Sequence, residues 1–371
     1  MSGKVCAQGE QQNGTKKVSP FGGLRIVSIL LYLFLQYMER SWLLKQPTMG
    51  WTGENVGYWI LGSLSFCCIN IYMLTTAYEL VDEKIRISAV AKLWGEVFFY
   101  SLLFAVITVA AGQATVDEVF GISNILFYVF PVSSGHFWLA TAYLLLLLFS
   151  PLLNKALQWM SQRHLGELTL VLLVPFSLLP SVCPTPPATD DLGMGVMWFI
   201  VLYLIAAYIK KFGMPKFEKL GLVFYFVFVA GIMLFEFLAG KIAFIFPRLD
   251  HYMAIPKQYN FIFSLFAAVA IVCFAKGRGG KSNAFSKALN RIAGYTFGIY
   301  LITDHIFVRY KWMDFLQFGE GKDPVWAHMI LSVLVAFAVA LCIDVVRTFL
   351  FKGISIVIRC IWKKKEKKAE E

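Results

Sequence analysis

The sequence predicts an all-α polytopic membrane protein with about ten transmembrane helices and both termini in the cytoplasm. Three observations predict this class. Hydrophobic residues make up 58% of the 371 residues, apolar runs of about 20 residues recur along the whole chain, and Lys and Arg gather in alternate loops. We expect no soluble domain, since the apolar runs leave room only for short connections.

Each predicted span is an apolar run long enough to cross roughly 30 Å of hydrocarbon as a helix, in which the backbone polar groups pair with one another. We place the spans at 22–39, 56–79, 93–112, 136–154, 167–183, 193–210, 220–240, 258–276, 293–311 and 326–351. Pro175 and Pro180 interrupt the fifth span, so a re-entrant helix is the alternative there. Residues 121–131 are too short to cross and are predicted to form an interfacial or re-entrant helix.

The distribution of charge predicts the orientation and the domain organisation. With the N-terminus inside, most of the 34 Lys and Arg residues fall in cytoplasmic segments, as the positive-inside rule requires, whereas loops 113–135 and 184–192 contain none. Residues 1–20 are then a polar cytoplasmic segment, residues 21–352 the membrane domain, and residues 353–371 a basic cytoplasmic tail. We expect the plasma membrane as the location.

The net charge of +11 does not indicate a nucleic-acid-binding protein. The basic residues lie in short inner loops and in the C-terminal stretch WKKKEKKAEE, not on a soluble basic face. The predicted partner is therefore the lipid bilayer, whose anionic inner leaflet attracts basic segments of this kind. The seven cysteines show no metal-ligand spacing, so we expect no metal site.

Polar side chains inside the predicted spans indicate function, because they are costly to place in hydrocarbon. Arg25 lies at the cytoplasmic end of the first span, and Gln36 lies roughly 16 Å deeper on the same side of the helix. Thr303, Asp304 and His305 reach the same depth in the ninth span, about 15 Å from its start. The alternative is ordinary hydrogen bonding between helices. The two spans are predicted to meet in a polar cluster, with an arginine placed to receive an anionic cytosolic substrate.

Several stretches occur in a particular order along the chain: LRIVSILLYLFLQY, INIYMLTTAYELVDEKIRISAVAKLWGEVFFYS, HFWLATAYLLLLLFSPLLN, WFIVLYLIAAYIKKF and TFGIYLITDH. In this order and spacing the chain, from residue 24 to about residue 350, resembles the acyltransferase 3 family of ten-helix membrane enzymes. The resemblance implies transfer of an acyl group, commonly acetyl, from cytosolic acyl-coenzyme A to a hydroxyl of an extracytoplasmic carbohydrate or a lipid-linked or related cell-surface acceptor.

The resemblance also implies roles for particular residues. Arg25 would help to hold the anionic coenzyme A donor. Gln36 stands where the family has the histidine that is its presumed base, and Thr303 stands where related chains have a second histidine. Gln36, Thr303, Asp304 and His305 would line the transfer point. In a regular helix His305 would face away from Thr303, because two residues turn the helix by about 200°.

The glutamine leaves three interpretations open, because a carboxamide can hydrogen-bond but cannot take and return a proton. In the first, the chain keeps the fold but has lost acyl transfer, and acts as a membrane scaffold, sensor or transporter-like component. In the second, Asp304, or His305 through a local kink, is the base. In the third, Gln36 was introduced to trap an inactive enzyme.

Residues at the two membrane faces complete the candidate site. Lys84, Arg86 and Lys92 are candidate donor-binding residues around Arg25, with plain solvated charge as the alternative. His136 and Trp138, at the outer end of the fourth span, are candidate acceptor-side residues, with an anchoring role at the interface as the alternative. Homo-oligomerisation, acyl length and acceptor identity are left open by the sequence.

Overall fold

The computed structural model describes residues 19–44, 53–84, 87–132, 134–279, 283–314, 316 and 325–370, and every regular element in these ranges is helical. The first half forms α1 (Gly22–Arg40), α2 (Gly53–Ser65), α3 (Cys68–Leu80), α4 (Ile87–Ala110), α5 (Val116–Phe120), α6 (Ile122–Val129), α7 (Trp138–Gln158), α8 (Gln162–Leu173), a π-helical turn (Val174–Leu178) and α9 (Leu179–Val182). The second half forms α10 (Val196–Lys211), α11 (Pro215–Ile245), short 3₁₀ turns (Pro247–Met253 and Ile255–Lys257), α12 (Ile262–Arg278), α13 (Ala284–Ala293), α14 (Thr296–Thr303), a 3₁₀ turn (Trp312–Asp314) and α15 (Val325–Glu370). The all-α class is confirmed for the described residues.

Seven helical stretches in the described part of the chain are long and apolar enough to cross a membrane. They are Asn55–Leu80, Ile87–Ala110, Trp138–Gln158, Gln162–Val182, Pro215–Ile245, Pro247–Arg278 and Val325–Ser355. These stretches match seven of the predicted spans, as expected for a polytopic membrane protein. The predicted spans 22–39, 193–210 and 293–311 are not among the seven.

The helices found within these three predicted spans, α1, α10 and α14, are short or carry polar residues. α10 has 16 residues and α14 has 8, whereas a crossing needs about 20. α1 has 19 residues, but it carries Arg25, Gln36, Glu39 and Arg40. Spans of this kind depend on neighbouring helices to cover their polar groups.

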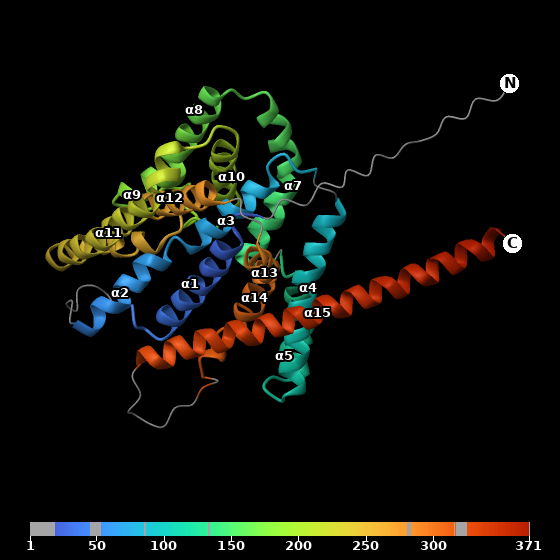
Figure 1. Ribbon diagram of the computed structural model, residues 1–371. Coiled ribbons are helices and arrows are strands. Elements are labelled where there is room, and N and C mark those ends of the chain that lie inside the picture. Colours follow the sequence, from blue (N-terminus) through green and yellow to red (C-terminus); the bar gives the residue numbers. More distant parts are fainter. Residues whose placement is uncertain are drawn as a thin grey trace, which may run out of the picture.

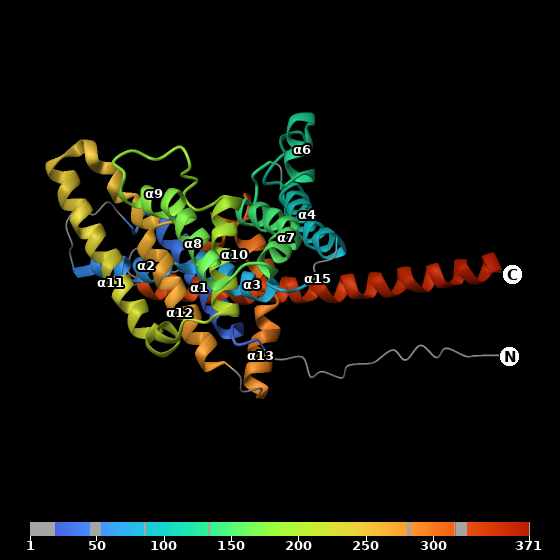
Figure 2. The same ribbon diagram turned by 90° about the horizontal axis from the view of Figure 1, so that it is seen from above.

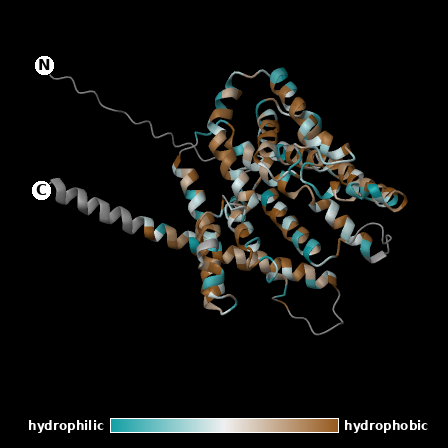
Figure 3. Ribbon diagram, turned by 180° about the vertical axis from the view of Figure 1, so that it is seen from behind, coloured by the Kyte–Doolittle hydropathy of each residue, from teal (hydrophilic) through white to brown (hydrophobic). Residues whose placement is uncertain are grey.

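α1 lies in the middle of the bundle, where it packs against α2, α3, α13, α14 and α15 (Figure 1). Burial separates the inner helices from the peripheral ones. In the most apolar part of Asn55–Leu80, 78% of the residues are buried, against 28% in the corresponding part of α11. Many of the exposed residues of α11 and α15 are large hydrophobic ones, and Figure 3 colours the hydrophobic residues of the bundle brown. Apolar side chains that find no protein partner on a helix of this length fit contact with lipid.

The fifth predicted span is a continuous helical stretch. Its prolines do not end the helix, and one of them lies in a π-helical turn, which is wider than an α-helical turn. The π-helical turn at Val174–Leu178 begins next to Pro175, and α9 continues from it. A π-type turn accommodates a residue that cannot donate a backbone hydrogen bond. In the region predicted to form a short helix at 121–131 the structure has α6, which lies with α4 and α5 at one side of the bundle (Figure 2).

The continuous helix predicted over 293–311 is wrong. α13 ends at Ala293, α14 ends at Thr303, and residues 304–311 form turns. Local hydrogen bonds take the place of the helix: the His305 carbonyl accepts from the N–H groups of Val308 and Arg309, and the His305 ring accepts from Phe307 N–H at 3.2 Å. Bonds from a backbone N–H to a nearby side chain compete with continuation of a helix.

α15 runs without a break from the last predicted span into the predicted tail 353–371, of which residue 371 lies outside the described part. In Figures 1 and 2 its C-terminal half extends beyond the other helices. Within the bundle, Arg347 Nε pairs with Asp344 and its Nη2 with Glu96 of α4, each at 2.7 Å. Tyr100 donates to the same Asp344 oxygen at 2.6 Å. These contacts join α15 to α4.

Candidate active site

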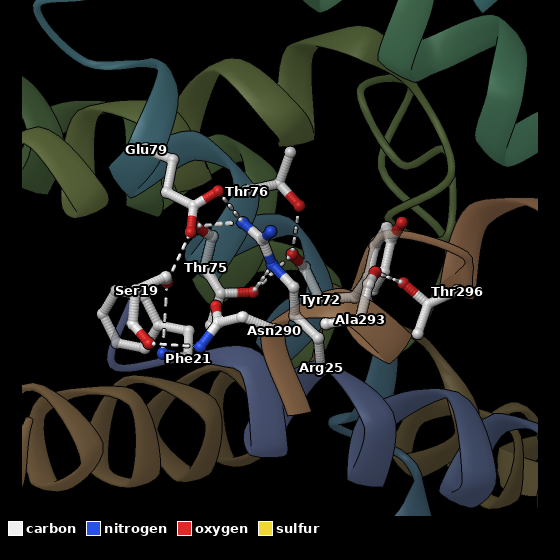
Figure 4. Close-up of polar contacts among 10 residues, drawn as sticks. All are labelled: Ser19, Phe21, Arg25, Tyr72, Thr75, Thr76, Glu79, Asn290, Ala293 and Thr296. Atoms are coloured by element: carbon white, nitrogen blue, oxygen red, sulfur yellow. Dashed lines mark hydrogen bonds and ion pairs between the residues drawn. The ribbon is translucent and has the colours of Figure 1, made fainter. Parts of the chain in front are cut away.

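Arg25 lies near the start of α1 and is held by α3 (Figure 4). Its Nη2 forms an ion pair with Glu79 at 2.7 Å and donates to the Thr75 carbonyl at 2.9 Å. Glu79 also accepts from Ser19 at 2.5 Å. The guanidinium is therefore compensated by a carboxylate, while 16% of the Arg25 side chain and 39% of the Glu79 side chain remain exposed. The ion pair is therefore partly accessible to solvent.

The other candidate donor-binding residues lie on the connection between α3 and α4 and on α4. Lys84 and Lys92 are exposed, and Arg86 lies outside the described residues. Solvated lysines at this surface raise the local concentration of anions without fixing their position. Their contribution to a donor site stays a prediction.

Gln36 and Asp304 meet, as the equal depths of the two residues predicted. Gln36 Nε2 donates to Asp304 Oδ1 at 3.0 Å, and both side chains are buried. The same Asp304 oxygen accepts from Arg40 Nη2 at 2.9 Å. Because a carboxylate only accepts hydrogen bonds, this contact fixes the orientation of the amide. Gln36 Oε1 is then left as a buried acceptor with no hydrogen-bond partner among the described residues.

Arg40 was missed by the sequence analysis, which placed it beyond the first span. It follows Gln36 by four residues and so lies on the same face of α1. It also donates to the carbonyl of Arg309, which fastens the end of α1 to the turns after α14. Its spacing from Gln36 was the signal available in the sequence.

Thr303 is buried beside Asp304 but is directed into its own helix. Its hydroxyl donates to the carbonyl of Ile299 at 2.9 Å. A hydroxyl bonded four residues back along the helix is a common way to satisfy a threonine in an apolar setting. The structure thus brings Thr303 next to the polar cluster without giving it a contact to Gln36.

His305 lies in the turns that follow α14, and its ring contacts other groups than the Asp304 carboxylate does. Its Nδ1 accepts from Phe307 N–H at 3.2 Å, and its Nε2 lies 3.2 Å from the Ser101 carbonyl. A ring nitrogen that accepts from a backbone N–H carries no proton, so Nε2 carries it and donates to Ser101. Both ring nitrogens are thereby used by the backbone, and neither is directed toward Gln36.

His136 contacts His305, which the sequence analysis did not foresee. The two ring centroids are 4.6 Å apart. His136 is stacked against Phe127 with centroids 4.9 Å apart, and its Nε2 accepts from Ile306 N–H at 3.4 Å. Trp138 is only partly buried and stacks on Tyr259, with ring centroids 5.3 Å apart. No pattern in the sequence pairs His136 with His305, since they lie in separate predicted spans.

Comparison of the chain with protein-family models, with curated proteins and with solved structures finds no match. The chemistry of the site is therefore argued from its own residues. It contains a partly exposed arginine–glutamate pair at one end of α1, a cluster of Gln36, Asp304 and Arg40 at the other end, and two adjacent imidazoles beyond Asp304.

Proposed function

We propose that this protein is a membrane acyltransferase that moves an acyl group, in the first instance acetyl, from cytosolic acyl-coenzyme A to a hydroxyl of an extracytoplasmic carbohydrate or related acceptor. The observation that supports it most is the buried contact between Gln36 and Asp304. This contact joins the first helix, which also carries Arg25, to the chain just after α14. It gives the two-element polar cluster that the resemblance to the acyltransferase 3 family implies.

The topology proposed for this enzyme has ten crossings, with both termini in the cytoplasm of a cell whose plasma membrane holds the protein. α1, α10 and the α13–α14 segment would add three crossings to the seven apolar stretches. The Lys and Arg distribution of the loops supports this orientation. Arg25 would then face the cytoplasm, where acyl-coenzyme A is found.

Donor binding in this proposal replaces one anion by another. The phosphates of coenzyme A would take the place of the Glu79 carboxylate on the Arg25 guanidinium, which offers two parallel N–H groups to such a ligand. Lys84 and Lys92 would add attraction at longer range. At the other end of α1, Gln36 Oε1 is an unused buried acceptor that can receive the O–H of the acceptor substrate.

A second candidate function is a catalytically silent relative that binds an acyl donor and acts as a scaffold, sensor or transporter-like component. Two features of the site favour this second function. Gln36 cannot take a proton, and Asp304, the nearest carboxylate, is paired with Arg40. Protonation of a carboxylate that is paired with an arginine would leave the arginine without its counter-charge, which is costly in a buried site.

Turnover of acetyl-coenzyme A by the purified protein distinguishes the two functions. If the enzyme acts through positioning, the chain with Gln36 is expected to release coenzyme A in the presence of a carbohydrate acceptor. Gln36→His is expected to raise this rate by about 100-fold or more, since a positioned base contributes about 10²–10⁴. Arg25→Ala is expected to raise the KM for acetyl-coenzyme A.

One control variant and the binding of acetyl-coenzyme A complete the experiment. Gln36→Leu, which keeps the helix but removes the buried amide, is expected to lose turnover. Silence from both the chain with Gln36 and the Gln36→His variant, with acetyl-coenzyme A still bound, would favour the silent relative. Silence without binding would overturn both functions.

A further inference from the structure

The His136 ring has one nitrogen that no described residue satisfies. The side chain is 6% exposed, and its Nδ1 is a buried atom with no hydrogen-bond partner in the described part of the chain. A buried polar atom left unpaired costs about 1–3 kcal/mol. Such a group in a native protein calls for a ligand or a water. The His136 imidazole is packed by aromatic side chains, and Phe127 stacks on its face.

The backbone fixes which His136 nitrogen carries the proton. Ile306 N–H donates to Nε2 at 3.4 Å, and a nitrogen that accepts a hydrogen bond carries no proton. The ring is therefore neutral, with its hydrogen on Nδ1. The unpaired atom is thus a hydrogen-bond donor, and the group that completes the site must bring an acceptor oxygen.

His305 fixes the conformation of the turn at residues 305–307, which in turn sets the tautomer of His136. Its two ring nitrogens bond to Phe307 N–H and to the Ser101 carbonyl of α4. These bonds fasten the residues on either side of Ile306, whose N–H is directed at His136. His305 is thereby a positioning residue, which acts through the turn and not on a substrate.

We propose that the Nδ1–H of His136 donates a hydrogen bond to the carbonyl oxygen of the acyl group during transfer. This inference rests on the proposed acyltransferase function and adds to it the group that stabilises the reacting carbonyl. The acceptor hydroxyl oxygen bonds to the carbonyl carbon, the bond from that carbon to the coenzyme A sulfur breaks, and the hydroxyl proton ends on that sulfur. His136 keeps its proton throughout.

The surroundings suit a donor of this kind. Negative charge develops on the carbonyl oxygen as the new bond forms, and a fixed donor in a water-excluded site stabilises that charge strongly. Gln36 and His136 both contact the 304–306 segment, Gln36 at Asp304 and His136 at Ile306. The first offers an unused acceptor and the second an unused donor, which match a hydroxyl and a carbonyl.

Three substitutions distinguish the effect of the Nδ1–H donor on turnover from the effect of the shape of the ring. His136→Asn places an amide N–H near the position of Nδ1, His136→Gln places it near that of Nε2, and His136→Phe keeps only the stacking on Phe127. In whichever background turns over, the chain with Gln36 or its Gln36→His variant, His136→Phe is expected to lower kcat by about 100–1000-fold with little change in KM. His136→Asn is expected to recover at least about 10-fold of this loss, and His136→Gln is not. Equal loss in all three, or full activity of His136→Phe, would overturn the proposal.

Nitrogen-15 NMR of the histidine-labelled full chain gives a readout that needs no turnover. The His136 signals are identified as those absent from the spectrum of the His136→Phe variant. They are expected to show a protonated Nδ1 and an unprotonated Nε2, and acetyl-coenzyme A is expected to shift the Nδ1 signal. His305→Phe, which frees the turn, is expected to let the other tautomer appear. A protonated Nε2, or an Nδ1 signal that acetyl-coenzyme A leaves unchanged, would overturn the proposal even if transfer occurs. A shifted Nδ1 in a protein without turnover would instead count against the proposed enzyme function alone.

Discussion

Asp304→Ala is expected to lower the free energy of unfolding by about 3–5 kcal/mol. The substitution removes the only carboxylate that the described residues place on Arg40, whose side chain is 14% exposed, and it also removes the acceptor of the Gln36 amide. A charge that stays buried after its partner is lost accounts for most of the cost. Thermal or denaturant unfolding of the purified protein in detergent measures the change.

Asp314→Ala is the matched control, because Asp314 is an exposed acid on the same connection. It is expected to change stability by less than about 0.5 kcal/mol. The double substitution Arg40→Met with Asp304→Leu is expected to recover part of the loss, since it leaves no buried charge. The account of this cluster is contradicted if Asp304→Ala costs no more than the control.

Gly221→Ala is expected to cost about 3 kcal/mol at the contact between α11 and α12. A methyl group at Gly221 would lie 2.3 Å from the carbonyl oxygen of Ala270 and 2.9 Å from Cβ of Phe274. A backbone carbonyl inside a helix cannot turn away, so the two helices would have to separate. The same unfolding measurement in detergent reports the effect.

Gly231, on the same helix pair, provides the comparison. A methyl group there would meet only the ring of Phe263, at 3.3 Å or more. Gly231→Ala is expected to change stability by less than about 1 kcal/mol, because a small movement of the ring is offset by the better helix propensity of alanine. Similar losses at both glycines would show that close backbone approach at Gly221 is not what holds these helices together.

Much of the fold follows from the sequence because membrane helices obey a length rule. Apolar runs predicted all seven of the apolar stretches, including the one interrupted by Pro175 and Pro180. The depth argument also placed Gln36 level with Asp304, since both the start of α1 and the start of the ninth predicted span were anchored at one membrane face. Equal depth allowed the two residues to meet, and the structure places them 3.0 Å apart.

The rest depends on contacts that no local pattern encodes. The break after Thr303 coincides with contacts from distant elements. The side chains of Gln36 and Arg40 donate to Asp304, and the backbone carbonyl of Ser101 accepts from the His305 ring. The compensation of Arg25 by Glu79 likewise joins α1 to α3 across the inner part of the bundle. Periodicity reports which residues share a face of one helix, but not which helix that face meets.

The pairing of His136 with His305 shows the same limit most clearly. From the sequence, His136 is a candidate acceptor-side residue at the outer end of the fourth span, and His305 is a candidate base only through a local kink. In the structure both imidazoles are buried, and the backbone N–H groups of Ile306 and Phe307 make both of them neutral. Only the path of the chain after α14 sets this arrangement.

Acyl transfer across the membrane can be followed with a labelled acetyl group on acetyl-coenzyme A, supplied on one side of liposomes that contain either the chain with Gln36 or its Gln36→His variant. For the proposed acyltransferase, the label is expected to leave coenzyme A and to appear as an ester on a carbohydrate enclosed on the other side, faster with the Gln36→His variant. Label that stays on coenzyme A in both preparations, with no binding of acetyl-coenzyme A to either protein, would contradict the proposed function.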